Sequence, residues 1–333
     1  MNMTDNYPPI IQEEETANKN SFPILAQLGI LGGIFVIIFG SWAVSQLNAT
    51  PQEATPTPTR LDLDDKQYPI TPQKIEEVSI TGEAAYVWDV KAQKALYSKN
   101  AETVLPLASI TKLMTALVAH ELVSENEKAT VSLSAILQEG SSGFTDGEIL
   151  TSEDLRNMAL VSSSNDAAYA LAANVGALLG EQDPVAQFVA GMNIRADELG
   201  LYTLDFKNTT GLDISANKPG AVGSARDVSF LMEHIVEAYP EILEPTQESA
   251  TRIYNTAGSF HNANNTNKAV NEIPNLIGSK TGYTDLAGGN LTVAFDAGNN
   301  RPIIVTVLGS TRSERFTDVL NLISATELVL GNN

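Results

Sequence analysis

Three short strings in this chain carry side chains that together could perform acyl transfer on a serine. A serine hydroxyl is a weak nucleophile until an adjacent base takes its proton. The chain has only three histidines, no cysteine and no G-x-S-x-G elbow, so a lysine is the better candidate for that base. In chain order the strings are Ser109-Ile110-Thr111-Lys112, Ser163-Ser164-Asn165 and Lys280-Thr281-Gly282.

The first string places a hydroxyl and an amine one helical turn apart. Ser109 and Lys112 can therefore lie on the same helix face. Lysine acts as a base only if its pKa falls from about 10.4 toward 7. Two ammonium groups about 4 Å apart repel each other by about 4 kcal/mol at an effective dielectric near 20. We therefore predict that Lys280 lies near Lys112 and lowers its pKa.

Each string also has an ordinary structural interpretation. The spacing Ser-x-x-Lys recurs at Ser215 and Lys218, in a stretch that ends in Pro219-Gly220 and reads as a loop. A serine before a helix is often only an N-cap, and a lysine is often only solvated. The strings gain significance from their order and from the elements predicted around them.

The second string falls between two predicted helices, where a loop can point its side chains into a cleft. Ser163 could relay a proton to a leaving group, and the Asn165 amide could hold a substrate carbonyl. Helix capping by the same residues is the alternative.

The third string follows an apolar strand and is predicted to end it. Lys280 and Thr281 could hold an anionic end of a substrate, and Gly282 would allow a close backbone approach. The backbone N–H groups of Ser109 and Tyr283 could then form an oxyanion hole. An exposed lysine before a turn is the alternative.

The elements that must position these residues are predicted from periodicity and turn residues. Strands are expected at both ends of the folded region and helices in its middle, which predicts an α+β fold with an antiparallel sheet. The predicted strands are 83–90, 94–97, 276–280, 291–297 and 303–308, and the predicted helices are 108–121, 151–161, 165–179, 183–199, 226–239 and 314–329.

The first part of the chain is predicted to be a membrane anchor and a stalk. Residues 22–44 are apolar and long enough to cross a bilayer, with a cleaved signal peptide or a buried helix as alternatives. Residues 45–78 are rich in threonine and proline and read as a disordered linker. This leaves residues 1–21 as a cytoplasmic tail and residues 79–333 as the folded domain.

Composition excludes several kinds of partner. A formal net charge of −20 disfavours nucleic acid and anionic lipid surfaces as ligands. Without cysteine there is no disulfide or zinc–thiolate site, and the histidines form no H-E-x-x-H pattern.

With their flanking residues, the strings resemble the low-molecular-mass penicillin-binding proteins, specifically the serine D-alanyl-D-alanine carboxypeptidases of the peptidase S11 type. The resemblance implies a β-lactamase/transpeptidase-like fold, an antiparallel sheet flanked by helices with a helical subdomain. The stretches that carry it are 84–89, 106–116, 164–168, 208–212 and 278–285.

The resemblance also implies roles for individual residues. Ser109 would attack the carbonyl of the penultimate D-alanine in a peptidoglycan stem peptide, with Lys112 as base and Ser163 passing the proton to the departing D-alanine. β-Lactams would acylate Ser109, and the reaction would need no metal and no organic cofactor. The expected substrate-binding residues are Asn165, Lys280, Thr281, Tyr283 and Arg312.

The substrate lies outside the cytoplasm, so this function requires a bacterial cell membrane location. The chain would cross the membrane once, with an extracytoplasmic catalytic domain.

The resemblance leaves three alternatives. Shorter members of the family include D,D-endopeptidases, which cut peptidoglycan cross-links, so the choice between the two activities stays open. A non-catalytic cell-wall-binding module with the same fold is a further possibility. A class A β-lactamase shares the strings but needs a glutamate within E-x-x-L-N, and no such string occurs between Asn165 and Lys280.

Overall fold

The structure is a computed structural model that describes residues 75, 78–140, 142–180 and 182–331. The predicted tail and apolar span, and most of the predicted linker, lie outside these residues. Ile75 falls within the predicted linker range and is buried. No helix in the described part of the chain is long and apolar enough to cross a membrane.

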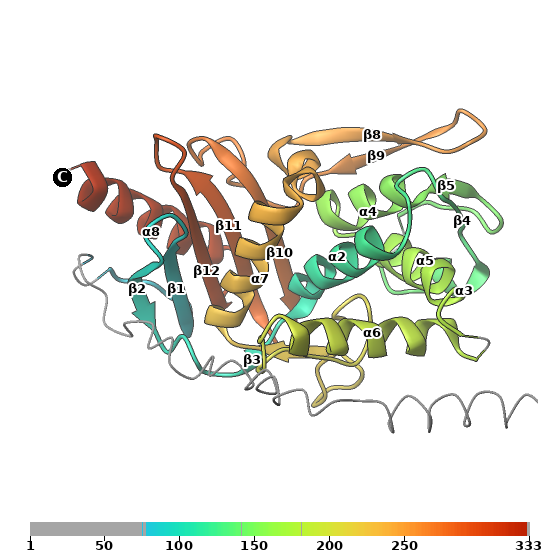
Figure 1. Cartoon of the computed structure of the whole chain (residues 1–333), viewed down its shortest axis with the longest axis horizontal. Helices are drawn as coiled ribbons and strands as arrows, with labels where there is room; N and C mark the ends of the chain where they lie inside the picture. Colours follow the sequence, from blue (N-terminus) through green and yellow to red (C-terminus); the bar gives the residue numbers. More distant parts are fainter. Residues whose placement is uncertain (1–74, 76–77, 141, 181, 332–333) are drawn as a thin grey trace, which may run out of the picture. The chain divides into compact units, whose positions relative to one another are not determined.

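A five-stranded antiparallel sheet forms the centre of the fold, in the strand order β10-β11-β12-β1-β2 (Figure 1). The predicted hairpin is confirmed as β1 (Ala84–Asp89) and β2 (Lys94–Lys99). β10 (Leu276–Thr284), β11 (Gly288–Asp296) and β12 (Pro302–Ser310) complete the sheet. Ala84 pairs with Leu308, so strands from the two ends of the folded region lie side by side.

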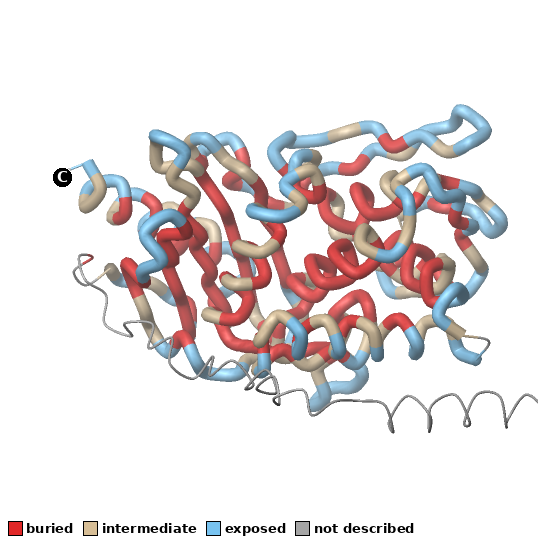
Figure 2. Tube along the Cα trace, viewed as in Figure 1, coloured by how far each residue is buried: buried red, intermediate tan, exposed pale blue. Residues whose placement is uncertain are grey.

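Helices cover both faces of this sheet, and β1 shows why its strands are buried throughout. Tyr86 and Trp88 pack into one core and Val87 into another, because alternate side chains point to opposite faces. α7 (Ala225–Ala238) covers the first face and α8 (Glu314–Gly331) the second. Figure 2 shows the central strands as largely buried, whereas buried and more exposed segments alternate along α8. The predicted α+β architecture is confirmed.

A helical subdomain occupies the middle of the sequence. Its helices are α2 (Lys112–Leu122), α3 (Leu133–Ile136), α4 (Ser152–Val161), α5 (Asn165–Gly176) and α6 (Pro184–Glu198). α5 is buried among α2, α4 and α6, and its alanines let these helices approach closely. Thr151 caps α4, since its hydroxyl accepts a hydrogen bond from the Asp154 N–H at 3.0 Å.

Short elements join the helical part to the sheet. They are β3 (Leu105–Pro106), η2 (Ala108–Thr111), β4 (Lys128–Thr130), β5 (Ile149–Thr151), β6 (Asp205–Phe206), β7 (Ala221–Gly223), η3 (Pro240–Ile242), η4 (Glu244–Gln247), β8 (Ala250–Tyr254) and β9 (Phe260–Asn264). The β8–β9 hairpin was not predicted. Each strand is only five residues long, and three of the five residues of β9 are asparagine or alanine, which are depleted in strands.

Two predicted boundaries were wrong near the strings of interest. The predicted strand 276–280 continues to Thr284, because Lys280 pairs with Thr292 and Thr284 with Gly288. Lys280 therefore lies inside a strand and not at its end. The predicted helix 108–121 begins with the 3-10 turn η2, and the α-helix starts only at Lys112.

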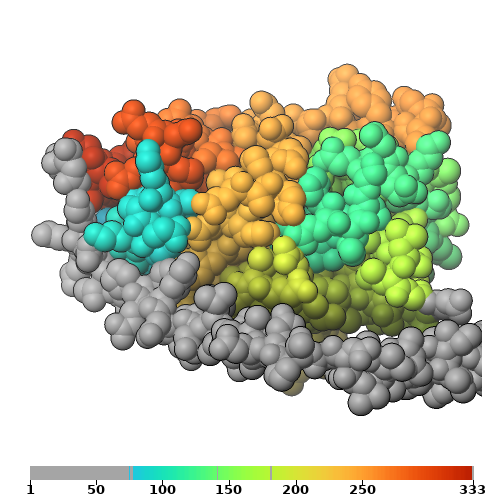
Figure 3. Space-filling model, viewed as in Figure 1, coloured from blue at the N-terminus to red at the C-terminus, as the bar shows by residue number. Residues whose placement is uncertain are grey.

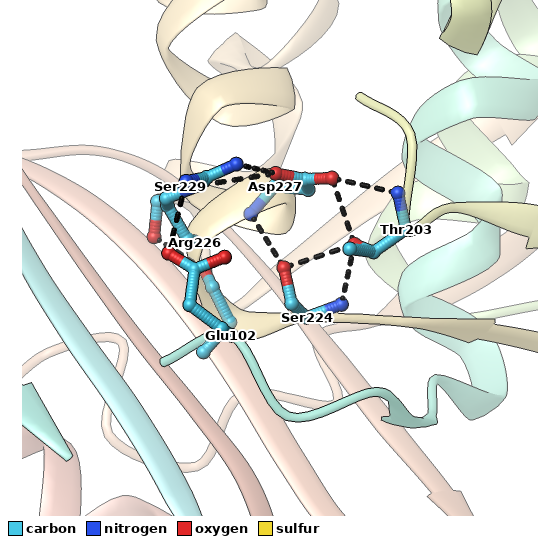
Figure 4. Close-up of polar contacts among 7 residues, drawn as sticks. Glu102, Thr203, Ser224, Arg226, Asp227 and Ser229 are labelled. Carbon is cyan, nitrogen blue, oxygen red and sulfur yellow. Dashed lines mark hydrogen bonds and ion pairs between the residues drawn. The ribbon is translucent and has the colours of Figure 1, made fainter. Parts of the chain in front are cut away.

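A polar network fixes the start of α7, the helix that lies on the molecular face shown in Figure 3. Ser224 caps the helix and accepts a hydrogen bond from the Asp227 N–H at 3.1 Å. The Asp227 carboxylate in turn accepts from the Thr203 N–H at 2.9 Å and from its hydroxyl at 2.7 Å (Figure 4). Arg226 pairs with Glu102 at 2.9 Å. These contacts tie α7 to the chain just before the helical subdomain and just after it.

Asn290 on β11 ties the sheet to the segment that precedes Ser109. Its Nδ2 donates to the carbonyls of Pro106 at 2.9 Å and Leu107 at 3.0 Å. Its Oδ1 accepts from the Gly309 N–H at 2.9 Å, and the residue is fully buried. One side chain thus satisfies three backbone groups on two other segments.

We expect Asn290→Leu to lower the free energy of unfolding by about 3 kcal/mol, because each buried group left without a partner costs roughly 1–3 kcal/mol. Denaturant unfolding measures this change. Asn271→Leu is the control, since Asn271 is exposed. Equal effects of the two substitutions would show that the buried contacts of Asn290 carry no special weight.

Candidate active site

Ser109 lies in a strained turn between β3 and α2. Its neighbour Ala108 has a φ of 48°, in the left-handed region that non-glycine residues rarely adopt. Ser109 is partly exposed, whereas Lys112, one turn further on, is fully buried. Lys112 Nζ lies 2.8 Å from Ser109 Oγ. The structure therefore places the hydroxyl and the amine in direct contact, as predicted from their spacing.

The other two partners of Lys112 fix the direction of its hydrogen bonds. Nζ donates to Asn165 Oδ1 at 2.7 Å and to the Thr210 carbonyl at 2.8 Å. Asn165 Nδ2 donates to the Glu139 carbonyl at 2.6 Å, which sets the orientation of the amide. Both oxygens that face Lys112 can therefore only accept. When the amine is neutral, its lone pair must point at the one partner with a proton to give, the Ser109 hydroxyl.

Burial lowers the pKa of Lys112 to about 7. The sequence predicted a pKa near this value but attributed it to repulsion from Lys280. Burial is the main cause, because removing an ammonium from water disfavours its charged form. The repulsion acts on Lys280 instead, where burial and then the charges of Lys112 and Arg315 hold the pKa well below its ordinary value.

Lys280 reaches the second string from the centre of β10. Its Nζ donates to Ser163 Oγ at 2.8 Å and to the Thr281 carbonyl at 2.8 Å. Ser163 has a φ of 60°, a second left-handed residue at the site. Ser163 thus contacts Lys280, and Asn165 contacts Lys112, so the second string bridges the two lysines.

Two glycines bring other segments against the turn that holds Ser109. A Cβ on Gly282 would lie 2.7 Å from the Leu107 carbonyl oxygen and 3.2 Å from the Ser109 nitrogen. Gly211 has a φ of +79°, and a Cβ there would overlap the Ala108 carbonyl. β10 and the 208–211 turn therefore touch the nucleophile turn by backbone alone. Tyr283 directly follows Gly282, the residue through which β10 approaches the Ser109 amide.

Thr281 and the two nearby arginines complete the β10 side of the site. Thr281 Oγ1 is hydrogen bonded to Thr266 Oγ1 at 2.7 Å. The predicted Arg312 is exposed and lies over the exposed Tyr283 ring, with 5.0 Å from its Cζ to the ring centroid. Arg315 is buried and donates to the Gly282 carbonyl at 2.6 Å, and burial lowers its pKa to about 10.

Three contributors were not predicted: the Thr210 carbonyl, the Thr266 hydroxyl and Arg315. Backbone carbonyls carry no sequence signal, and threonine at Thr266 occurs in an unremarkable loop. Arg315 stands at the start of α8, where the sequence gives no reason to prefer it to Arg312.

Two surface hollows adjoin the site. One, of about 500 Å³, is lined by Ser163, Asn165, Met158 and residues of β9. The other, of about 400 Å³, is lined by Tyr283, Thr284 and Asp213. They lie toward β9 and toward the end of β10, so an extended ligand would have room on both sides of the lysines.

The ionisable side chains around the hydroxyls are basic, although the whole chain is strongly acidic. Within the described ranges, no carboxylate lies within ion-pair distance of Lys112 or Lys280. The same part of the chain holds no cluster of histidine and carboxylate side chains that could bind a metal ion. The residues present suit a serine nucleophile with a lysine base and an anionic ligand.

We expect Lys112→Met to flatten the pH dependence of stability. The lysine pKa is about 7 when folded and 10.5 as its ordinary value, so between these pH values the unfolded state binds more protons. Its contribution to stability is complete above the ordinary pKa and is lost as pH falls through about 7. The wild-type free energy of unfolding should therefore rise relative to the variant by about 2 kcal/mol between pH 7 and 9.

Denaturant unfolding at the two pH values measures this difference. Lys218→Met is the matched control, because Lys218 belongs to the second Ser-x-x-Lys string but is exposed. An unchanged pH dependence in Lys112→Met would contradict the burial account of its pKa.

Comparison with known proteins places this geometry in a family. The family model Peptidase_S11, D-alanyl-D-alanine carboxypeptidase, matches residues 71–312. D-alanyl-D-alanine carboxypeptidase DacF of Bacillus subtilis is 30% identical over 265 residues, 75% of this chain and 63% of the relative. A D-alanyl-D-alanine endopeptidase of Pseudomonas aeruginosa is 32% identical over 247 residues, 72% of this chain and 75% of the relative. The chain thus spans less than two thirds of the length of the Bacillus relative.

Solved structures agree with the fold. Ampicillin-bound Penicillin-Binding Protein D2 of Listeria monocytogenes has a TM-score of 0.63 and 29% identity, covering 75% of this chain and 98% of that one. The Streptomyces K15 DD-transpeptidase, with 24% identity and a TM-score of 0.67 over 75% of this chain and 98% of its own, shares the fold. The resemblance inferred from the three strings is confirmed, and the chain belongs to the peptidase S11 family.

Proposed function

We propose that this chain is a serine D-alanyl-D-alanine carboxypeptidase that removes the terminal D-alanine from peptidoglycan stem peptides through an acyl-enzyme on Ser109. The observation that carries the proposal is the 2.8 Å contact between Ser109 Oγ and Lys112, a buried lysine whose pKa of about 7 lets it act as a base at neutral pH. Family membership supports the reaction class.

Acylation begins with the Ser109–Lys112 pair. Neutral Lys112 takes the hydroxyl proton as Ser109 Oγ attacks the carbonyl carbon of the penultimate D-alanine. Negative charge develops on the carbonyl oxygen, and the N–H groups of Ser109 and Tyr283 stabilise it. The close contact of Gly282 with the Ser109 nitrogen supports this pairing of amides.

Departure of the terminal D-alanine requires a proton on its nitrogen. The proton that Lys112 took from Ser109 reaches this nitrogen through the Ser163 hydroxyl as the C–N bond breaks, and Lys280, which donates to Ser163 Oγ, holds that hydroxyl in place. The remaining acyl group is an ester on Ser109. Water then hydrolyses this ester, and the shortened stem peptide leaves with a new carboxylate.

Recognition of the substrate depends on its terminal carboxylate. Lys280 and Thr281 bind it, with Arg312 and Tyr283 at the exposed end of β10 and Asn165 holding a peptide carbonyl. In the free site burial and neighbouring cations lower the pKa of Lys280. An arriving carboxylate offsets that repulsion and favours the charged lysine. The site therefore gains its full positive charge when the anionic ligand binds.

β-Lactams would acylate the same serine as mimics of this substrate. The ampicillin-bound and cefotaxime-bound forms of the Listeria relative support this proposal. We also propose that residues 22–44 anchor the chain in the bacterial cell membrane by a single span, with the catalytic domain on the outer side where peptidoglycan lies. The apolar sequence of that segment supports the anchor.

A D,D-endopeptidase that cuts peptidoglycan cross-links is the second candidate. Its support is the endopeptidase of Pseudomonas aeruginosa, of which this chain covers 75%, compared with 63% for the Bacillus carboxypeptidase. Both reactions use the same acyl-enzyme. They differ in the group that leaves, a free D-alanine or the side-chain amine of a second stem peptide.

We expect a fluorescent penicillin to label the full-length protein covalently and Ser109→Ala to abolish the label. Gel fluorescence after denaturation measures it. Ser215→Ala is the matched control, because Ser215 is the other serine with a lysine three residues later and should leave labelling intact. Labelling that persists in Ser109→Ala would contradict the proposal of an acyl-enzyme on Ser109.

The choice between the two reactions is tested with two substrates. We expect the protein to release D-alanine from a pentapeptide stem at least about tenfold faster, in kcat/KM, than it cleaves a cross-linked dimer, a difference of about 1.4 kcal/mol in transition-state binding. Chromatography of the products measures both rates. A reversed order of the two rates would identify the endopeptidase.

A further inference from the structure

The β8–β9 hairpin carries a polar and aromatic strip on its outer face. Exposed and buried side chains alternate along both strands, as the two-residue period of a strand requires. Tyr254 pairs with Phe260, Arg252 with Asn262, and Ala250 with Asn264. We call the exposed set of these residues the hairpin strip: Ala250, Arg252, Tyr254, Phe260, Asn262 and Asn264.

The inner face of the hairpin is firmly anchored, so the strip is held in place. Ile253 and Ala263 are buried in the core that also holds the helical subdomain. His261 Nε2 lies 2.6 Å from Glu148 Oε1, next to β5. Asn265, just after β9, donates to the backbone before β8 at 2.9 Å. In Figures 1 and 3 the hairpin stands as a ridge above α4.

The strip exposes groups of three kinds. Tyr254 is 51% exposed and Phe260 47%, with their ring centroids 5.8 Å apart. Arg252 lies over the Phe260 ring, with 4.8 Å from its Cζ to the centroid. A cross-strand aromatic pair stabilises a hairpin by itself, which accounts for the two rings. It does not account for two exposed asparagine amides on the same face.

The strip continues into the candidate active site. Asn262 and Asn264 line the hollow of about 500 Å³ that also contains Ser163 and Asn165. Phe260 lies two residues beyond Asn262 on the same strand, so the strip extends about 7 Å past the hollow at ~3.4 Å per residue. A ligand that fills the hollow and extends past Asn262 must lie along this strip.

We propose that the hairpin strip binds the glycan chain of peptidoglycan, the amino-sugar polymer that carries the stem peptide. Sugar rings have apolar C–H faces that can cover exposed aromatic rings. The amides of Asn262 and Asn264 offer donors and acceptors for hydroxyl and acetamido groups. This inference rests on the proposed function, because the stem peptide must occupy the lysine cleft for its glycan to reach the strip.

Charge favours this occupant over a peptide with many acidic groups or a lipid surface. Arg252 is the single charged residue of the strip, and the other exposed members are uncharged. One arginine, already held over the Phe260 ring, gives little attraction for a polyanion, whereas the rings and amides of the strip suit a neutral polar polymer. A second stem peptide in the same place is the competing occupant, and the experiment distinguishes the two.

The test uses the full-length protein and the double substitution Tyr254→Thr with Phe260→Thr, which keeps β-branched residues in the strands. Tyr202→Thr is the control, since Tyr202 is an exposed tyrosine on the α6–β6 connection. The substrates are a bare pentapeptide, the same pentapeptide on glycan oligomers, and a peptide dimer without sugar. Binding to peptide-free glycan strands is measured separately by co-sedimentation.

We expect the wild type to have a KM about tenfold lower for the glycan-borne pentapeptide than for the bare one, the effect of about 1.4 kcal/mol of added binding. The double variant should lose this advantage and its co-sedimentation with glycan. Its penicillin labelling and its kcat on the bare peptide should stay unchanged, and its thermal midpoint should fall by only a few degrees, because the lost aromatic pair contributes about 0.2–1 kcal/mol. Tyr202→Thr should behave as wild type.

Three results overturn the inference: equal KM values for glycan-borne and bare peptides, glycan binding that survives in the double variant, or a KM advantage that appears with the sugar-free dimer instead. Failure of the proposed function looks different, because then the wild type releases no D-alanine from any substrate. Glycan co-sedimentation still decides the inference in that case.

Discussion

The site depends on keeping two lysines buried side by side in one cleft, and no carboxylate among the residues that the structure describes neutralises them. Lys112 and Lys280 come from opposite halves of the fold, α2 and β10, and are each about as inaccessible as a core leucine. Burying an unpaired ammonium is costly unless it loses its proton. The helical subdomain and the sheet must therefore pack tightly enough to exclude water from both amines. The same exclusion of water lowers the pKa of Lys112. The reactivity of Ser109 therefore depends directly on how tightly the core around Lys112 is packed.

Water is kept from the two lysines mainly by backbone segments that pack directly against the Ser109 turn, and less by hydrogen bonds between side chains. Gly282 and Gly211 let two segments reach the nucleophile turn without a Cβ between them. Ala108 and Ser163 hold left-handed conformations that cost free energy and are retained only where the surroundings enforce them. Asn290 fixes the segment before Ser109 to the sheet. Together these backbone features hold the Ser109 and Ser163 hydroxyls within hydrogen-bond distance of the two lysines.

The sequence allowed the fold class, most elements and the set of interacting side chains to be predicted, because these depend on periodicity and on residue type. It did not allow prediction of what depends on three-dimensional packing. Lys280 was placed at a strand end, because the apolar run stops there, whereas β10 continues to Thr284. Arg312 and Arg315 are indistinguishable by sequence, and only burial separates them. Thr210 acts through its carbonyl, which every residue has.

The pairing of β1 with β12 has a consequence for the order in which the chain acquires its properties. The central sheet needs strands from both ends of the folded region, and β10, which carries Lys280, is also formed late in synthesis. Contacts between such distant segments form slowly, because a long loop must close first. Until they form, Lys112 stays in water with its ordinary affinity for protons, and Ser109 has no base. A growing or partly folded chain is therefore chemically inert, and reactivity arises in one step when the last strands dock.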